Sequence, residues 1–503
     1  MGAAAPAARR AWSESVIVAF AAAGAAMHLS LSSQPLESMR VMAGFASGGM
    51  AFLYCARTSE AGSRRAVQAG IILAGTLLAL HGVWQAAGGF RMMAEGGGEA
   101  LPDALRARLA AGRAVAGLGL PGALGGFLIL SLPLTWGWLR SAMAKTPRGP
   151  WVVVAAVALL AQAAGLAATR SAAAMAALGL SIAVVMWRRA PAGRRRLVLW
   201  PLVVALPASV AMLVWRMASD PLANPFLLRA GNWKAALAIM ADHPLFGAGL
   251  GCFGIVFPAY RDWGMNESRH AHNVWLELAA EAGLPAALAA VALASWLLWR
   301  LLGRGSESRV SPFVATSCTA FLAHNTVDFT LYLPGVALAF FCLAGAECGR
   351  REPGAGSLSI SLRPVAAAAL AALVLLVAHG DVRRVSALDL ALSGQVPEAA
   401  EAAQGAVRAN PLDPASHALL SRLMVESGDL EGAERHAVRA VELDEQTPGH
   451  WHHLGRVRLA RSDPQGAYIA LHRAAQLYPI QLEYRADRDA VARLLERAPE
   501  GGS

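Results

Sequence analysis

The sequence predicts an all-α protein: a polytopic bundle of transmembrane helices with one large loop, followed by a domain of helical repeats. Of the 503 residues, 56% are hydrophobic. They gather in nearly uncharged blocks of about twenty residues, the length that a helix needs to cross a bilayer. The blocks stop near residue 380, and a polar segment rich in Ala, Leu, Glu and Arg follows, with a period of 34 residues.

The formal charge of +10 does not indicate a nucleic-acid partner, because the Arg residues cluster at the ends of the apolar blocks. That distribution is typical of membrane topology. The five cysteines form no metal-type pair and imply neither a disulfide framework nor a zinc site. The first apolar block follows Arg9 and Arg10 without a convincing cleavage site, so we expect a retained span and not a signal peptide.

About eleven apolar segments are expected to span the membrane, each satisfying its own backbone hydrogen bonds as a helix. They cover residues 14–31, 41–56, 66–86, 115–138, 151–169, 171–187, 197–216, 274–299, 311–331, 334–348 and 364–380. Every second short loop is rich in Arg or Lys, which places those loops in the cytoplasm. The amino terminus is therefore expected inside, and everything after the last span outside, in the periplasm.

Two long segments then face the periplasm, and long loops on a rigid scaffold are where chemistry tends to lie. Residues 87–114 are rich in Gly and Ala, whereas residues 217–273 are richer in Trp, His, Arg and Gly. The second loop is the better candidate for a site. We expect residues 1–380 to form the membrane domain and residues 386–498 a separate periplasmic domain.

Small residues recur in register within residues 386–498. The columns of small residues are Gly394, Gly428 and Ser462; Ala399, Ala433 and Ala467; and Ala406, Ala440 and Ala474. The inter-repeat positions Asn410, Asp444 and Tyr478 fall in the same register. Small residues at fixed points let paired helices approach closely, and a helix–turn–helix period of this length resembles the tetratricopeptide repeat. The repeats suggest a protein or glycan partner; an accidental Ala-rich helical tail is the alternative.

The loop and the start of the next span carry a dense set of polar residues in a fixed order. The order is Arg229, Trp233, His243-Pro244-Leu245, Gly247, Gly249, Tyr260, His272, Asn273 and Gly283. This order resembles the large-loop region of the O-antigen ligase and polymerase family. The ligase signature prefers Gly, Thr or Tyr where this chain has Ala286, which leaves ligase and polymerase both open.

The resemblance extends to two further elements. Thr169-Arg170-Ser171, at the outer end of a span, is similar to the family's Ser-Arg element, with the order shifted. His324-Asn325 with Asp328, followed by Leu333-Pro334, looks like an element of the repeat-bearing members. Because His324 and Asp328 are four residues apart on one predicted span, their side chains are expected to share a helix face. Either they line the active cavity or they form an internal pair that locks helix packing.

The resemblance implies a membrane glycosyltransferase of the bacterial inner membrane. It implies transfer of a glycan from a polyprenyl-pyrophosphate carrier to a glycan, lipid or protein acceptor, in a direct inverting step. Polymerisation of repeat units and transfer to protein are alternatives within the family. It implies no metal or other cofactor, and no Walker-type loop exists in the sequence to supply ATP. Gly249 to Gly254 fit the dinucleotide pattern only formally, because no βαβ unit surrounds them.

The residue types fit that chemistry. A leaving pyrophosphate gains charge, and arginine offers a fixed charge with a planar donor fork for phosphate oxygens. Arg170 and Arg229 are the first candidates, with Arg261 and Arg269 secondary, and a topology anchor is the ordinary alternative for each. A histidine can take the acceptor proton near neutral pH, and His272 is the expected base, with His270 as the alternative and Asn273 as its orienting neighbour. Trp233, Trp263 and Trp275 are candidates for stacking on sugars, with interfacial anchoring as the commoner role of such aromatics. Tyr260 completes the expected binding residues.

Two other classes of function compete with the enzyme. A transporter or lipid-carrier flippase places charged residues along a route through several spans, whereas the polar groups here concentrate at one membrane face. A non-catalytic scaffold presenting the repeats predicts that Arg170, Arg229 and His272 can be replaced without loss.

Overall fold

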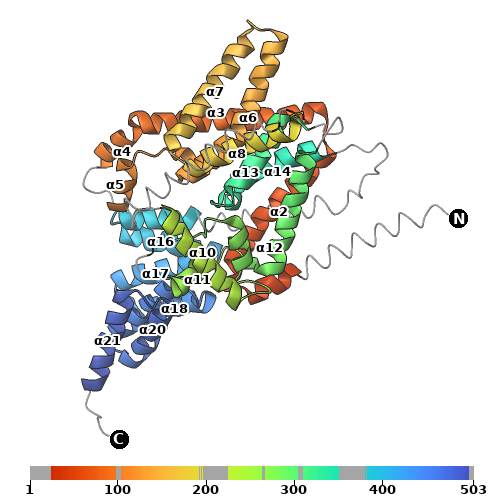
Figure 1. Cartoon of the computed structure of the whole chain (residues 1–503). Coiled ribbons are helices and arrows are strands. Elements are labelled where there is room, and N and C mark those ends of the chain that lie inside the picture. Colours follow the sequence, from red (N-terminus) through yellow and green to blue (C-terminus); the bar gives the residue numbers. More distant parts are fainter. Residues whose placement is uncertain are drawn as a thin grey trace, which may run out of the picture.

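The computed structural model describes residues 24–97, 103–191, 193, 195, 225–262, 265, 267–303, 310–349, 380 and 382–497. Every regular element in these ranges is a helix, which confirms the all-α prediction for the described part of the chain. Figure 1 shows a membrane bundle above and the repeats below it, with two loop helices between them.

Eight helices build the bundle. They are α2 (Pro35–Arg57), α3 (Ala61–Trp84), α6 (Pro121–Lys145), α7 (Pro150–Thr169), α8 (Ala172–Arg189), α12 (Val274–Leu301), α13 (Pro312–His324) and α14 (Pro334–Cys348). Helix α6 is central: 72% of its most apolar window is buried, against 17% for α12. It packs against α3, α7, α8 and α13. Shorter helices cap the bundle beside α3: η1 (Gln85–Gly89), α4 (Phe90–Gly97), α5 (Asp103–Ala110) and η3 (Ala116–Leu118).

Five helical segments among the described residues are long and apolar enough to cross a membrane. They are Ala61–Gly96, Pro121–Lys145, Pro150–Thr169, Ala172–Arg189 and Val274–Leu301, and Pro334–Cys348 is a shorter apolar helix. The predicted spans 197–216 and 364–380 lie outside the described residues apart from Gly380, as does most of 14–31. The count of eleven spans therefore stays a prediction.

One predicted span ends early. The expectation was a single helix over residues 311–331, but α13 ends at His324, and a turn leads into the short helix η5 (Thr330–Tyr332). Asn325 explains the break, because its side-chain oxygen accepts a hydrogen bond from the Leu331 amide (2.8 Å) and its amide nitrogen donates to Phe321 (2.8 Å). The prediction that His324 and Asp328 share a helix face is therefore wrong, since Asp328 lies in the turn.

The carboxyl-terminal helices follow the predicted period. They are α16 (Val396–Ala409), α17 (Pro414–Glu426), α18 (Leu430–Leu443), α19 (Pro448–Ala460), α20 (Pro464–Leu477) and α21 (Leu482–Arg497), and each packs against the next. Both alanine columns are buried between helices. The column of Gly394, Gly428 and Ser462 has positive φ angles of 78°, 85° and 64°. It therefore forms the left-handed turns that join successive helices.

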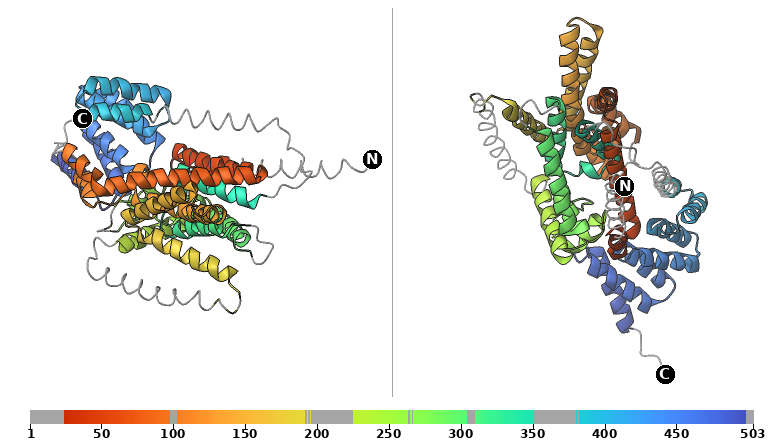
Figure 2. Two further views of the ribbon diagram at one scale, coloured as in Figure 1. Left: turned by 90° about the horizontal axis from the view of Figure 1, so that it is seen from above. Right: turned by 90° about the vertical axis from the view of Figure 1, so that its right-hand side faces the viewer.

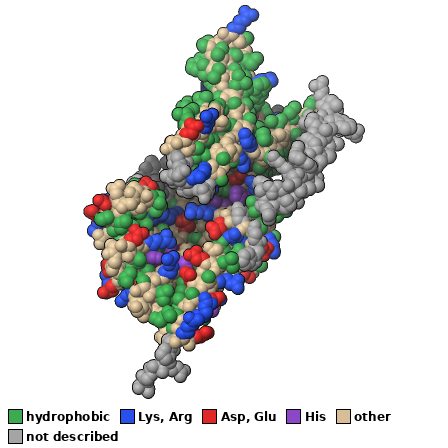
Figure 3. Space-filling model, turned by 90° about the vertical axis from the view of Figure 1, so that its left-hand side faces the viewer, with side chains coloured by type: hydrophobic (Ala, Val, Ile, Leu, Met, Phe, Trp, Pro, Cys, Tyr) green, Lys and Arg blue, Asp and Glu red, His purple; other side chains and the backbone are tan. Residues whose placement is uncertain are grey.

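The repeats lie beside the first part of α2 (Figure 2) and contact it through polar side chains. The Gln34 amide donates to Asp444 across 2.7 Å, and Asp413 lies 4.0 Å from the Arg40 guanidinium. Hydrophobic side chains cover the end of the molecule opposite the repeats, whereas charged side chains gather over the repeats (Figure 3). The polarity shift seen in the sequence thus corresponds to two structural parts in contact.

We expect Ser462→Gly to stabilise the protein. A residue with a Cβ costs about 1–2 kcal/mol in the left-handed region, and glycine loses about 0.5–1 kcal/mol more in unfolded-state entropy. The net gain is about 0.5–1 kcal/mol, measured by denaturant unfolding of the purified chain. Ser427→Gly is the matched control, because Ser427 has an ordinary φ of −86° and the same exchange there lowers stability. A loss of stability in Ser462→Gly contradicts this explanation of the repeat turn.

Candidate active site

Helix α12 is broken at Gly283, whose φ of 83° and ψ of 165° are not helical. The break leaves backbone carbonyls in the first half of α12 without helical hydrogen-bond partners. A loop segment donates the missing hydrogen bonds. The amides of Ala248 and Gly249 donate to the carbonyls of Ala280 and Glu281, each across 2.9 Å. In return, the Leu284 amide donates to the Pro244 carbonyl across 2.9 Å. We call this set of three hydrogen bonds the backbone clamp.

Glycines make the backbone clamp possible. Gly247 has a φ of 67°, and a Cβ built on it would overlap the Glu281 backbone. A Cβ on Gly283 would overlap the Leu245 carbonyl. Within the motif His243-Pro244-Leu245-x-Gly247-x-Gly249, the close approach of two backbones therefore explains Gly247, whereas a Cβ on Gly249 would overlap the Ser32 side chain. The glycines from Gly249 to Gly254 have other close neighbours, because a Cβ on Gly251 would meet Val41 and one on Gly254 the Arg269 backbone. No strand precedes this stretch among the described residues, so its match to a dinucleotide pattern stays formal.

Two carboxylates on the first half of α12 fix the loop that carries the histidines. Glu277 is fully buried; one of its oxygens lies 2.6 Å from His270 Nδ1 and the other accepts from the Ala271 amide (2.9 Å). Glu281 accepts from the Phe253 amide (2.9 Å) and from the Tyr332 hydroxyl (2.7 Å). Sequence reasoning missed both, although two acidic residues four apart at the start of an apolar span were a usable signal.

His272 presents its side chain differently from His270. His270 stacks on Phe329 with ring centroids 3.9 Å apart and is held by Glu277. His272 has a left-handed backbone (φ 55°), contacts Phe329 edge-on, and its Nδ1 is buried without a hydrogen-bond partner in the described part of the chain. Trp233 donates to the His272 carbonyl across 3.4 Å. Of the two histidines, His272 is the one with a buried ring nitrogen that has no hydrogen-bond partner in the described residues.

Burial lowers the pKa of His272 from 6.5 to about 4, and the positive charge of Arg229 acts in the same direction, while Asp328 opposes both. The sequence expectation was a value near the ordinary one. The pKa differs from the ordinary value because the histidine lies between the start of α12 and the turn after α13, where solvent is excluded. The imidazole is thus neutral at neutral pH.

Two arginines are joined through a reciprocal pair of backbone contacts. Arg113 Nε donates to the Thr169 carbonyl (3.1 Å), and Arg170 donates to the Ala111 carbonyl (3.3 Å). Arg170 ends α7 with a left-handed φ of 50°, and Ser171 then caps α8. The turn between α7 and α8, formed by Thr169-Arg170-Ser171, therefore places the Arg170 guanidinium beside the segment that contains Arg113.

A third arginine completes a cationic cluster. Arg229 lies on α10 (Pro225–Asp242) and its Nε is buried without a partner in the described residues. Burial lowers the pKa of Arg113, and the charges of Arg229 and Arg170 lower it further, while Asp328 opposes them. The three guanidinium groups therefore share one electrostatic field. Sequence reasoning missed Arg113 as a site residue, because a cation just before an apolar block is ordinarily a topology anchor.

Asp328 is the acidic residue that interacts electrostatically with this cluster, through Arg113 and His272. His324 Nε2 is 3.5 Å from its carboxylate and 3.2 Å from the Gly122 carbonyl. A Cβ on Gly122 would overlap the Asp328 carboxylate, so glycine at the start of α6 admits the acidic side chain. The two predicted site residues thus do meet, although through a turn and not along one helix.

The remaining predicted site residues have partners elsewhere. The Asn273 side chain caps α12 by accepting from the amides of Trp275 (3.1 Å) and Leu276 (3.2 Å). The Tyr260 hydroxyl, at the end of α11 (Phe253–Tyr260), donates to Asp242 across 2.7 Å. Arg269 is exposed next to His270.

Arg261 points away from the cluster. It hydrogen-bonds the Tyr478 hydroxyl, its guanidinium lies 5.5 Å from the centre of that ring, and Glu267 is 3.7 Å away. Tyr478 also donates to Glu267 across 3.0 Å. Arg261 therefore joins the loop to the repeats, at one of the inter-repeat positions that the period identified.

Several buried polar atoms without partners belong to the arginine cluster or to the elements that carry the site. Among the described residues they include Arg229 Nε, Asn232 Oδ1, His272 Nδ1, His324 Nδ1 and Thr330 Oγ1. Buried polar groups are ordinarily satisfied, so such a set marks a place where a ligand supplies the missing bonds. With three guanidinium groups and a neutral imidazole, the arrangement suits an anion beside a group that must lose a proton.

The fold and the site define a helical membrane protein with a cluster of arginines at one end of its bundle. Residues 154–291 match the sequence model described as O-antigen ligase. This stretch holds Arg170, Arg229 and His272, and it confirms the family predicted from the sequence. The chain thus carries an O-antigen ligase domain, and the function of that family is of the membrane glycosyltransferase type.

The chain was also compared with curated proteins and with solved structures. The comparison with curated proteins gives no match. Among solved structures, the chain is similar to the first TPR of Spaghetti (RPAP3) bound to an HSP90 peptide, with 18% identity and a TM-score of 0.23. That likeness covers 23% of this chain and 93% of the other.

We expect Gly247→Ala to destroy the site. The added Cβ has no room against the Glu281 backbone and sits at a positive φ, so the backbone clamp opens and stability falls by more than about 2 kcal/mol. Thermal unfolding in detergent measures this. Gly179→Ala is the matched control, because nothing lies within 4 Å of that Cβ and alanine favours a helix. Equal melting temperatures of the two variants contradict the clamp.

Proposed function

We propose that this protein transfers a glycan from a polyprenyl-pyrophosphate carrier to an acceptor hydroxyl. The observation that carries the proposal is the cluster of Arg113, Arg170 and Arg229 beside His272, surrounded by buried polar atoms without partners in the described residues. Ligation to a lipid core, the reaction of the family's name, is the proposed outcome. Elongation of a glycan is the alternative that the departure at Ala286 leaves open.

The proposed reaction is one displacement. The acceptor oxygen attacks the anomeric carbon, the bond from that carbon to the phosphate oxygen breaks, and the acceptor proton passes to His272. The polyprenyl pyrophosphate leaves with an added negative charge. Preorganised guanidinium groups stabilise that charge where it develops, at no cost of reorganisation. No covalent intermediate with the protein forms.

His272 fits the role of base because its buried Nδ1 is unpartnered in the described residues while His270 is engaged by Glu277. A pKa lowered to about 4 in the empty site makes it neutral but weakly basic. The bound diphosphate adds negative charge nearby, which raises the pKa of an imidazole. Substrate binding therefore strengthens the base that the reaction needs.

We further propose that the site faces the periplasm of the bacterial inner membrane. The cluster lies at the start of α6 and the end of α7, whereas Lys145 and Arg148 lie at the opposite ends of these helices. Arg188 and Arg300 lie in the last turns of α8 and α12. Basic helix ends of this kind are retained in the cytoplasm. The repeats, which contact the loop, then lie in the periplasm as well.

Replacement of the cluster is expected to abolish transfer without loss of protein. We expect His272→Ala to lower kcat by about 10²–10⁴-fold and Arg113→Ala or Arg229→Ala each by about 10²–10³-fold. The assay uses purified protein, a polyprenyl-pyrophosphate glycan and acceptor, with mass analysis of the product. Arg91→Ala is the matched control, because Arg91 is exposed and pairs only with Glu95 across 2.8 Å. Full activity in the cluster variants contradicts the proposal.

The pH dependence is expected to separate the free enzyme from its donor complex. Only neutral His272 accepts a proton, and a pKa lowered to about 4 keeps it neutral above pH 5, so kcat/KM for the donor stays flat from about pH 5 to 8. The bound diphosphate raises the pKa, so the acid limb of kcat lies at higher pH than that of kcat/KM. An acid limb of kcat/KM near 6.5, with the protein folded by circular dichroism, argues against this site for the base.

A further inference from the structure

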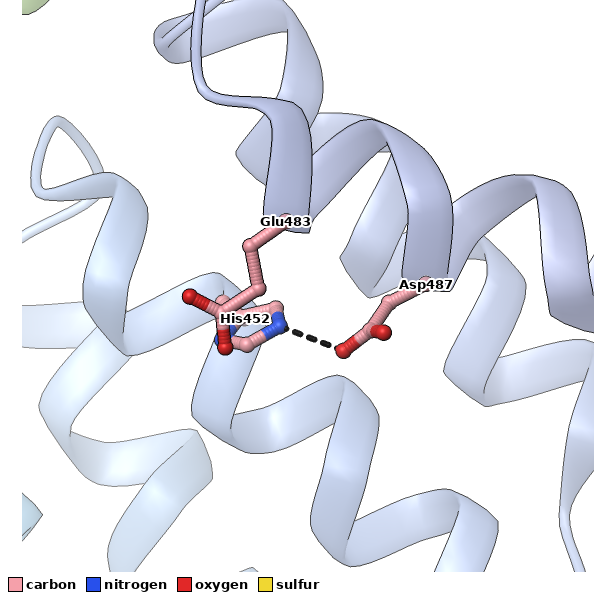
Figure 4. A group of neighbouring side chains, drawn as sticks. All are labelled: His452, Glu483 and Asp487. Carbon is pink, nitrogen blue, oxygen red and sulfur yellow. Dashed lines mark hydrogen bonds and ion pairs between the residues drawn. The ribbon is translucent and has the colours of Figure 1, made fainter.

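Three potential metal ligands meet at the far end of the repeats. His452 lies on α19, and Glu483 and Asp487 lie one turn apart on α21. His452 Nε2 is 2.8 Å from a carboxylate oxygen of Asp487, and one donor atom from each residue lies within 4.8 Å of the others. Figure 4 shows the three side chains directed toward one another across the two helices. No other group of three such ligands occurs within the described residues.

The donor set has the chemistry of a first-row transition metal. Imidazole nitrogen with carboxylate oxygens suits Zn²⁺, whereas Mg²⁺ and Ca²⁺ prefer oxygen alone. Two carboxylates balance the charge of a divalent ion, and three protein ligands leave a position for water. Glu483 is exposed and Asp487 is half-exposed, so an ion can enter from solvent.

The histidine is held in place before any ion arrives. Its side chain is 10% exposed, and its ring lies 4.5 Å from the ring of Tyr484, measured between centroids. An oriented imidazole loses little entropy when it takes a ligand position. The two carboxylates extend from one helix face at the spacing that brings side chains together.

We propose that His452, Glu483 and Asp487 bind one Zn²⁺ ion that cross-links α19 to α21. Helix α21 has Val491 as its one buried residue in the described range, so its own apolar contacts are sparse. A bound ion adds a second attachment between this last helix and the repeats. The proposal concerns the repeats alone and stands apart from the glycosyltransferase reaction.

The ion also stiffens the edge of the repeats that holds the loop. The ring centroids of Tyr484 and Tyr478 lie 6.2 Å apart. The Tyr478 hydroxyl forms hydrogen bonds with both Arg261 and Glu267 of the loop. A fixed α21 therefore keeps Tyr484 against the residue that joins the repeats to the membrane domain.

The test uses the full-length chain in detergent, stripped of metal with a chelator. Titration with ZnCl₂ by calorimetry is expected to show one ion per chain and a rise in melting temperature that the chelator reverses. Co²⁺ in place of Zn²⁺ is expected to give visible absorption bands of a site with nitrogen and oxygen ligands. His452→Ala and Asp487→Asn are each expected to weaken binding at least tenfold.

His472→Ala is the matched control, because His472 lies on α20 and contacts Gln476, away from the three ligands. It is expected to bind Zn²⁺ as the unmodified chain does. The conservative variant Asp487→Asn guards against misfolding, which circular dichroism checks. Equal affinity in His452→Ala and His472→Ala, or no saturable binding by the unmodified chain, overturns the proposal. Tighter binding of Mg²⁺ than of Zn²⁺ overturns it as well.

Discussion

The site depends on a broken helix. At Gly283 the backbone of α12 leaves the helical path, and its exposed carbonyls must find partners inside the protein, because lipid offers none. The amides of Ala248 and Gly249 supply them, and the return bond from Leu284 to Pro244 closes the backbone clamp. This contact fixes the loop against the first half of α12. It is the reason for glycine at Gly247 and Gly283, where any side chain would separate the two backbones.

The backbone clamp also positions the ionisable side chains of the site. Once the first half of α12 is fixed, Glu277 holds His270 and the Ala271 amide, and His272 follows with an unusual backbone and an unpartnered ring nitrogen in the described residues. The arginines reach the same place from separate elements: Arg113 and Arg170 through crossed contacts of two turns, and Arg229 from α10. Their mutual repulsion is unfavourable until an anion binds, which favours a diphosphate ligand over a neutral one.

The sequence predicted the helical class, the repeat register and the family, because each depends on a local pattern: apolar length, a fixed period and a motif. The charged chemistry expected at Arg170, Arg229 and His272 stays a prediction, which the electrostatic coupling of Arg229 to Arg113 and to His272 supports. The sequence could not predict Arg113, since a cation at a span end has the same local pattern whether it anchors a helix or lines a site. It also misplaced Asp328 on a helix, because the bonds from Asn325 that stop α13 are made to residues on both sides of the turn.

The central claim is that the arginine cluster binds a diphosphate, and calorimetry tests it without any acceptor. The probe is a short-chain polyprenyl diphosphate, with the corresponding monophosphate as comparison, titrated into the detergent-purified chain and into Arg229→Gln. The account predicts that the diphosphate binds at least tenfold more tightly than the monophosphate, and that Arg229→Gln removes most of that difference. Equal affinities for the two ligands, or an unchanged preference in Arg229→Gln, would contradict it.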